Sequence, residues 1–144
     1  MSLMSKRRLG REMVLQALYA YEFTKAPPGD IVENLKRFND LDAETEEFVI
    51  RLFNKTIEHQ EWGKEEIIRW LKNWDYERVA LIDRLILQMM IVEMVFLDDI
   101  PPKVSITEGV EIAKKYSTGE SGAFINGILD SVFHSLDSLS EPVK

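Results

Sequence analysis

The sequence predicts an all-α protein, and three observations lead to that class. Apolar residues recur at the i, i+3, i+4 spacing of a helix, the alternation typical of strands is nowhere sustained, and glycine and proline are few and clustered. The 144 residues, 45% apolar and 30% charged, can bury a sizeable core. We expect about seven helices in a single domain over residues 5–139, with residues 1–4 and 140–144 as flexible termini.

Three helices are expected in the N-terminal part of the chain. The first begins near Ser5, a good N-cap, and ends before the Pro27-Pro28-Gly29 turn. A short second helix follows Asp30, and a third begins after Asp42. The inward side chains of the second are Ile31, Leu35 and Phe38, and those of the third are Phe48, Val49, Leu52, Phe53, Thr56 and Ile57.

The next two helices differ in their polarity. A short fourth helix passes through Ile67, Ile68 and Leu71 and ends near Trp74-Asp75. The fifth, roughly Glu77 to Leu97, is apolar on nearly every side and long enough to cross a bilayer. The polar residues inside it would each be costly near the bilayer centre; they are Asp83, Arg84, Gln88 and Glu93. We therefore interpret it as a central helix surrounded by the others.

Two further helices follow a turn at Asp98–Pro102. Ser105 and Glu108 have the spacing of a capping box, which predicts a sixth helix that runs to about Tyr116. Residues 117–120 are expected to form a loop, with Ser121 as the N-cap of the last helix. The apolar face of that helix contains Phe124, Ile125, Ile128, Leu129, Val132, Phe133 and Leu136.

Signs of catalysis are thin. Cysteine is absent, which excludes disulfides, thiolate nucleophiles and cysteine-ligated zinc, and no phosphate-binding loop or zinc-protease motif occurs. His59 and His134 lie in unrelated segments and are interpreted as surface histidines. The three tryptophans, interpreted as core residues rather than a ligand box, are Trp62, Trp70 and Trp74. We expect a non-catalytic cytoplasmic protein without metal, cofactor, signal peptide or membrane contact.

Charge is segregated along the chain. The formal net charge is −7, which argues against a nucleic-acid partner, but screening limits the reach of a charge to about 10 Å at ~0.1 M salt. Residues 5–16 hold four basic side chains and one acidic one, whereas residues 40–47 hold five acids and no base. The basic start of the first helix is therefore the feature that needs an explanation.

The basic residues are Lys6, Arg7, Arg8 and Arg11. At 100° per residue, a broad face of the first helix is expected to be buried, and it comprises Leu9, Met13, Ala17, Ala20 and Tyr21. Arg8, Leu15 and Tyr19 lie on the opposite side, with Arg11 adjacent. Guanidinium groups contact phosphates and a tyrosine ring stacks on an unpaired base, so this face suits RNA. A frayed, solvated N-terminus is the alternative that these residues leave open.

The start of the last helix is a second candidate site. Gly127 lies within its apolar pattern, where glycine costs about 1 kcal/mol relative to alanine. We interpret that cost as a sign of close packing, and the alternative is a backbone group left for a partner. Phe124 fits the core stripe but also opens the helix, where its ring can face solvent.

Three motifs occur in order over about residues 6–134. They are Arg7-Arg8-x-x-Arg11-Glu12 leading into Leu15-Gln16-Ala17-Leu18-Tyr19; Ile100-Pro101-x-Lys103-Val104-x-Ile106-x-Glu108 with Glu111-Ile112-Ala113-Lys114; and Phe124-Ile125-Asn126-Gly127-Ile128-Leu129-Asp130. In this order and at this spacing, they resemble NusB-type transcription antitermination factors. The resemblance implies two small helical bundles packed across each other. It also implies binding of the boxA element of nascent ribosomal transcripts together with the ribosomal protein NusE, within the elongating RNA polymerase complex.

The resemblance also implies roles for individual residues. Arg7, Arg8 and Arg11 would contact RNA, with Gln16 and Tyr19 at the border of the site. A second side of the RNA surface would comprise Glu120, Ser121 and Phe124, the last as a stacking ring. Glu93 would belong to the surface that faces NusE.

Two other classes of function remain. One is a non-catalytic accessory domain of an RNA methyltransferase, since the same helical domain is fused to such enzymes. The other is a protein-interaction module without RNA binding, which the acidic net charge favours, together with Ala123 where the family often has lysine. The sequence leaves open the RNA sequence preference and whether the chain forms a homodimer.

Overall fold

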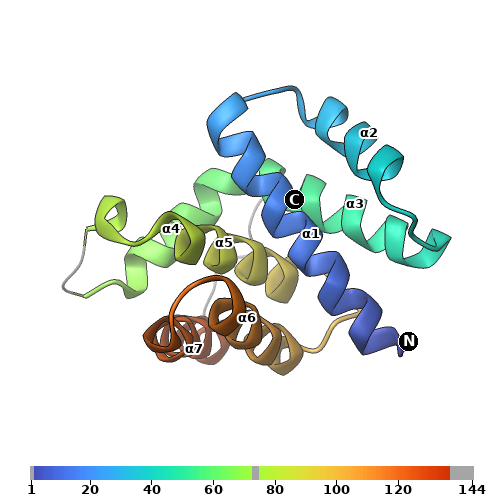
Figure 1. Ribbon diagram of the computed structural model, residues 1–144. Coiled ribbons are helices and arrows are strands. Elements are labelled where there is room, and N and C mark those ends of the chain that lie inside the picture. Colours follow the sequence, from blue (N-terminus) through green and yellow to red (C-terminus); the bar gives the residue numbers. More distant parts are fainter. Residues whose placement is uncertain (1, 73–74, 137–144) are drawn as a thin grey trace. The chain divides into compact units, whose positions relative to one another are not determined.

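The computed structural model describes residues 2–72 and 75–136. Within these ranges it contains seven α-helices, one short 3-10 helix and no strand, which confirms the all-α prediction (Figure 1). The chain divides into two compact units, residues 1–58 and residues 59–144. In the described part of the chain, no helix is both long and apolar enough to cross a membrane.

The first unit contains α1 (Leu3–Thr24), α2 (Pro28–Phe38) and α3 (Ala43–Glu58), drawn from blue to green in Figure 1. α1 packs along α3, and α2 contacts both. Gly10 allows the close approach of α1 and α3, because a Cβ there would lie 3.0 Å from Val49 Cγ2. The apolar core of this unit includes Val14, Leu18, Phe48, Leu52 and Phe53.

The second unit contains α4 (Gln60–Trp70), the 3-10 helix η1 (Tyr76–Arg78), α5 (Leu81–Phe96), α6 (Pro102–Tyr116) and α7 (Gly119–His134). α5 is its central helix, as expected: it contacts α4, α6 and α7, and every residue from Leu85 to Met94 is buried. α6 and α7 also pack on each other closely. A Cβ on Gly109 of α6 would lie 2.9 Å from Leu129 Cδ1 of α7.

Several helix ends differ from the prediction. α1 begins at Leu3 with Ser2 as N-cap, whose hydroxyl accepts the Ser5 N–H. α6 begins at Pro102, so Ser105 lies inside the helix rather than capping it. Thr118, not Ser121, caps α7. In each case the structure extends the helix by a few residues beyond the cap that the sequence suggested.

The expected fifth helix is divided. Residues 76–78 form η1, and Val79 and Ala80 have extended backbone before α5 begins at Leu81. Trp74 and the segment after Leu139 lie outside the described residues. The predicted second to fifth helices are otherwise present as α2 to α5.

Phe38 and His59 are placed differently from the prediction. Phe38, expected to face inward, is 74% exposed at the end of α2. His59, expected at the surface, is buried and stacks on Phe96 with ring centroids 3.9 Å apart, because α4 packs against α5 at that point. Trp62, interpreted as a core residue, is half-buried and contacts the same Phe96 ring edge-on.

Candidate functional site

The basic start of α1 is partly engaged with its own unit. Lys6 Nζ lies 2.8 Å from Asp42 Oδ2, and both side chains are about two-fifths exposed. The contact raises the pKa of Lys6 and, together with the Thr45 amide, lowers that of Asp42. Asp42 thus both caps α3, by accepting the Thr45 N–H at 2.8 Å, and holds the cation at the start of α1.

Arg7 and Arg11 both lie against α3. Their guanidinium carbons are 4.9 Å and 5.2 Å from the centroid of the Phe48 ring, the geometry of a cation–π contact. Arg7 is half-buried, whereas Arg11 is only 2% exposed. The expectation that Arg11 lies on a solvent-facing RNA surface is therefore wrong. The side chain fills space beside α3.

The prediction for Arg11 was wrong because it rested on helical phase alone. The prediction took one face of α1 as buried, but six consecutive residues, Gly10 to Leu15, are buried on all sides of the helix. Leu15, expected to be exposed, is 2% exposed, and Leu9, expected to be buried, is 44% exposed. The central turns of α1 are thus buried, whether their side chains are charged or apolar.

Four exposed residues remain along one side of α1, and we call them the α1 face: Arg8, Gln16, Tyr19 and Phe23. Glu12, in the same sector between Arg8 and the other three, is buried. At 100° per residue these four positions fall within a sector of about 80°. Tyr19 is 42% exposed and Phe23 is 66% exposed, with their ring centroids 4.9 Å apart. Phe23 was not predicted as a site residue, although a position four residues after Tyr19 lies on the same side of a helix.

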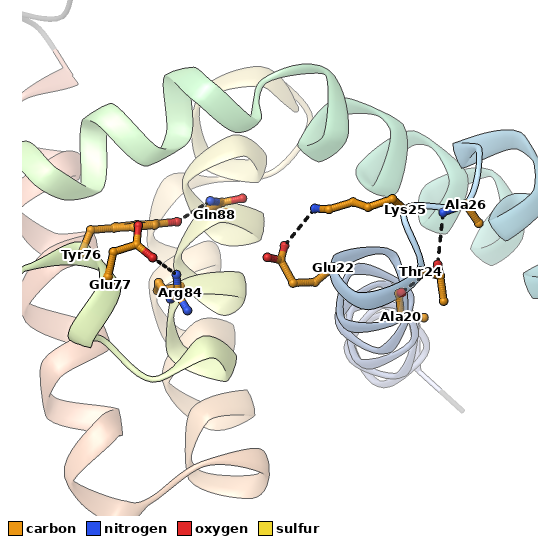
Figure 2. Close-up of polar contacts among 9 residues, drawn as sticks. All are labelled: Ala20, Glu22, Thr24, Lys25, Ala26, Tyr76, Glu77, Arg84 and Gln88. Carbon is orange, nitrogen blue, oxygen red and sulfur yellow. Dashed lines mark hydrogen bonds and ion pairs between the residues drawn. The ribbon is translucent and has the colours of Figure 1, made fainter.

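The end of α1 is fixed just beyond this aromatic pair. Figure 2 shows the Thr24 hydroxyl donating to the Ala20 carbonyl at 3.0 Å and accepting the Ala26 N–H at 3.2 Å. Lys25 ends the helix in the left-handed conformation and forms an ion pair with Glu22 at 3.6 Å. The two aromatic rings are therefore presented by an ordered helix end.

The second candidate site is a pocket of about 340 Å³ at the start of α7. Its lining residues are Arg78, Val79, Ala80, Asp83, Thr118, Glu120, Ser121 and Phe124. Glu120 is exposed, Phe124 is half-buried and Ser121 is 7% exposed. The structure thus brings together all three residues that the sequence assigned to the start of this helix, and it adds Arg78 and Asp83, which were missed.

A hydrogen-bond network forms one wall of this pocket. The Ser121 hydroxyl donates to Asp83 Oδ2 at 2.9 Å and also lies within 3.0 Å of the Thr118 hydroxyl. Asp83 is 7% exposed, and its second oxygen, Oδ1, has no hydrogen-bond partner among the described residues. A buried carboxylate oxygen without a donor is costly, so this atom is unusual.

Tyr76 holds in place η1, whose last residue, Arg78, lines the pocket. Figure 2 shows Gln88 Nε2 donating to the Tyr76 hydroxyl at 2.6 Å, and Arg84 contacting Glu77 at 3.4 Å. The Tyr76 ring also makes two cation–π contacts, with Lys64 Nζ at 5.1 Å and with the Arg84 guanidinium at 5.2 Å. These contacts attach η1, and with it Arg78, to α4 and α5.

Glu93 does not lie on any surface. It is 0% exposed, and its Oε2 accepts a hydrogen bond of 2.5 Å from the Ser105 hydroxyl. The expectation of a surface that faces a partner at Glu93 is wrong, because this part of α5 is covered by α6.

Gly127 is also placed differently from its interpretation. It is exposed, and a Cβ built on it would meet nothing within 4 Å. Close packing therefore does not explain this glycine, and the alternative, a backbone surface available to a partner, is the one that remains. No group of three acidic or histidine side chains suited to holding a metal occurs in residues 2–72 and 75–136.

These features define an all-helical protein with two surfaces suited to binding. The chain belongs to the NusB family, whose family model matches residues 8–134. It is 45% identical over 130 residues to "Transcription antitermination protein NusB" of Methylacidiphilum infernorum (isolate V4), which covers 90% of this chain and 91% of that relative. A protein of the same name from Geobacillus kaustophilus (strain HTA426) is 40% identical over 127 residues, covering 88% of this chain and 95% of the relative.

Solved structures agree with this assignment. T. maritima NusB is 33% identical, with a TM-score of 0.79 over 94% of this chain and 93% of that one. The fold also matches a chain of a complex described as antitermination factors NusB and NusE with dsRNA, at 23% identity and a TM-score of 0.81. That match covers 92% of this chain and 99% of the other, and at such an identity it bears on the fold alone.

Proposed function

We propose that this chain is a transcription antitermination factor that binds boxA-type RNA of nascent transcripts together with NusE. In this role it is a non-catalytic cytoplasmic protein that joins the elongating RNA polymerase complex through its partners. The names of the relatives support the role, and the NusB–NusE–RNA complex among the structural neighbours supports the partners. The alternative of a methyltransferase accessory domain has no such support from these names.

The observation that carries the proposal is the α1 face. Arg8 to Phe23 spans about 22 Å of helix, enough to contact several successive nucleotides. The Arg8 guanidinium suits a phosphate, the Gln16 amide suits the edge of a base, and the exposed Tyr19 ring suits stacking on an unpaired base. Lys6 and Arg7, half-buried beside α3, add positive potential at the same end of the helix.

Two of the residues that the resemblance assigned to binding, Arg11 and Glu93, do not contact RNA or NusE in this proposal. Arg11 is buried against Phe48, so it supports the helix that presents Arg8 rather than touching RNA itself. Glu93 is buried and is not part of the NusE contact. Glu120 and Phe124 form a second RNA-binding surface at the pocket, with Ser121 as a support within it.

A titration of short single-stranded boxA-like RNA, with and without NusE, tests the proposal. We expect weak binding by the chain alone and tighter binding when NusE is present, because a second protein adds contacts to the same RNA. Tyr19→Ala should weaken binding, whereas Phe38→Ala, which removes an exposed ring of α2, should leave it unchanged. Absence of RNA binding in both the presence and the absence of NusE would contradict the proposal.

A further inference from the structure

We propose that the pocket at the start of α7 holds one unpaired base of the bound RNA and selects guanine through the carboxylate of Asp83. This inference rests on the proposed function and specifies a base preference for it. The pocket has a volume of about 340 Å³, within the range of sites that enclose small ligands. Single-stranded RNA is generally recognised through splayed bases in such sites.

The apolar lining suits the flat face of a base. Phe124 is half-buried at the pocket, so one part of its ring is supported and another part is accessible. Val79 and Ala80 contribute aliphatic surface from the extended segment between η1 and α5. An aromatic ring with aliphatic neighbours can stack on any base, so these residues favour a base without choosing among the four.

The polar residues that line the pocket distinguish among the four bases. Asp83 Oδ2 already accepts the Ser121 hydroxyl, and Oδ1 has no donor among the described residues. Oδ1 is covered in the unbound protein, so an N–H group of a ligand would supply the missing donor once the Asp83 carboxylate turns toward the pocket. Guanine presents two adjacent donors, N1–H and the 2-amino group, which match the two oxygens of a carboxylate. Adenine and cytosine present one amino group on that edge, and uracil places a carbonyl on each side of its single N–H.

The charges of the pocket favour a base inside it over a phosphate. Asp83 and Glu120 place two carboxylates at the pocket against one guanidinium, that of Arg78, which disfavours a phosphate inside. The Arg78 side chain is 79% exposed, and its contact with Asp75, at 3.8 Å, is also exposed and therefore weak. It can thus attract the phosphate of the same nucleotide.

The contacts of η1 fix the position of Arg78 at the pocket. It is the last residue of η1, which Tyr76 attaches to α5 through the hydrogen bond from Gln88. Asp83 lies in the first turn of α5, just beyond the extended Val79 and Ala80. One short segment therefore carries the cation that faces the phosphate and leads directly to the carboxylate that faces the base.

The experiment compares short oligouridines that carry one guanosine at each position in turn, bound to the full chain with NusE present. We expect the best-placed guanosine to bind at least about tenfold more tightly than oligouridine. Inosine at that position lacks the 2-amino donor and should lose most of the gain. Asp83→Asn should lose the preference for guanosine, because its amide donates toward the base. Asp130→Asn, the same charge change on the exposed face of α7, should keep it.

The outcomes separate this inference from the proposed function. If no oligonucleotide binds, the proposed function fails and the inference fails with it. If RNA binds but guanosine, inosine and uridine are equivalent, or Asp83→Asn keeps the preference, only the inference is overturned. If Asp83→Asn weakens NusE binding in the absence of RNA and leaves the base preference unchanged, the pocket holds a side chain of the partner protein and the inference is wrong. The inosine comparison uses the unaltered chain, so it is informative whether or not the variant folds.

Discussion

The Ser121 hydroxyl donates a hydrogen bond of 2.9 Å to Asp83 Oδ2, and this contact joins the first turn of α7 to the first turn of α5. It buries a carboxylate that has no other partner among the described residues. Within this wall, the Ser121 hydroxyl is the one donor to the Asp83 carboxylate among the described residues. The contact couples the stability of the α5–α7 packing to the shape of the candidate binding site.

Ser121→Ala should lower the free energy of unfolding by about 1–3 kcal/mol, because it leaves both oxygens of Asp83 without a donor. Chemical denaturation with urea measures this change. Ser131→Ala is the matched control, since Ser131 is half-buried and, among the described residues, its hydroxyl bonds only the Gly127 carbonyl of its own helix, in an exposed hydrogen bond. The effect of this substitution should stay within about 0.5 kcal/mol. Equal effects of the two substitutions would mean that the Asp83 contact does not stabilise the fold.

Alanine substitutions of Arg8 and Arg11 should have different effects, the first on RNA affinity and the second on the free energy of unfolding. Arg11→Ala removes a 2% exposed side chain packed on Phe48 and should lower the free energy of unfolding by more than about 1 kcal/mol. Arg8→Ala changes an exposed residue and should alter that free energy by less than about 0.5 kcal/mol while it weakens RNA binding. Thermal unfolding and an RNA titration of both variants test this. If Arg11→Ala is as stable as the unaltered protein but binds RNA more weakly, Arg11 belongs to the RNA-binding surface.

Two glycines should respond to alanine in opposite directions. Gly127→Ala should stabilise the protein by up to about 1 kcal/mol, because the new methyl group meets nothing within 4 Å and alanine favours the helix. Gly109→Ala should destabilise it, since the methyl group would lie 2.9 Å from Leu129 Cδ1 and 3.1 Å from Met90 Cγ. Urea unfolding measures both. If Gly127→Ala also weakens NusE or RNA binding, its backbone is a contact surface, and a gain in stability without such a loss would count against that role.

The Lys6–Asp42 pair should make stability depend on acid pH. Lys6, and then Thr45, lower the pKa of Asp42 below its ordinary value of 3.8, so the folded state releases this proton more readily than the unfolded state does. The resulting stabilisation is present above that ordinary value and is lost as the pH falls toward the lowered pKa. Asp42→Asn keeps an N-cap for α3 but removes the charge.

Urea unfolding as a function of pH tests this pair. The difference in stability between the unaltered protein and Asp42→Asn should be largest near neutral pH, narrow below pH 3.8, and shrink with added salt because both groups are exposed. Asp40→Asn, two residues earlier, should leave the pH profile parallel to that of the unaltered protein. A constant difference at all pH values would show that the charge of Asp42 contributes nothing.

The sequence predicted the helices well, since each long apolar stripe produced one. Ile86 to Val92 read correctly as a central helix because a helix that is apolar on every side must be covered on every side. The helix ends were less predictable. Ser5, Ser105 and Ser121 are all good caps by type, yet backbone geometry placed the caps at Ser2, Pro101 and Thr118. Side-chain preference is only one of several terms that decide where a helix begins.

The candidate site was predicted in part. Arg8, Gln16 and Tyr19 are exposed as expected, and Glu120, Ser121 and Phe124 do line one pocket. Arg11 and Glu93 could not be placed correctly, because a charged side chain suggests solvent exposure and only tertiary packing shows that it is buried. Asp83 and Arg78 were missed because the pocket depends on packing between α7 and the start of α5, which no local pattern reveals.

The dependence of RNA affinity on salt tests the central claim, that the α1 face binds RNA phosphates, most directly. Each phosphate contact contributes a slope of about −0.7 to the logarithm of the binding constant against that of the salt concentration for a single strand. Arg8→Ala should therefore weaken binding and make the slope shallower by about 0.7. Arg37→Ala, an exposed arginine at the end of α2, should change neither. If Arg8→Ala binds RNA with the affinity and salt slope of the unaltered protein, the α1 face is not the RNA surface.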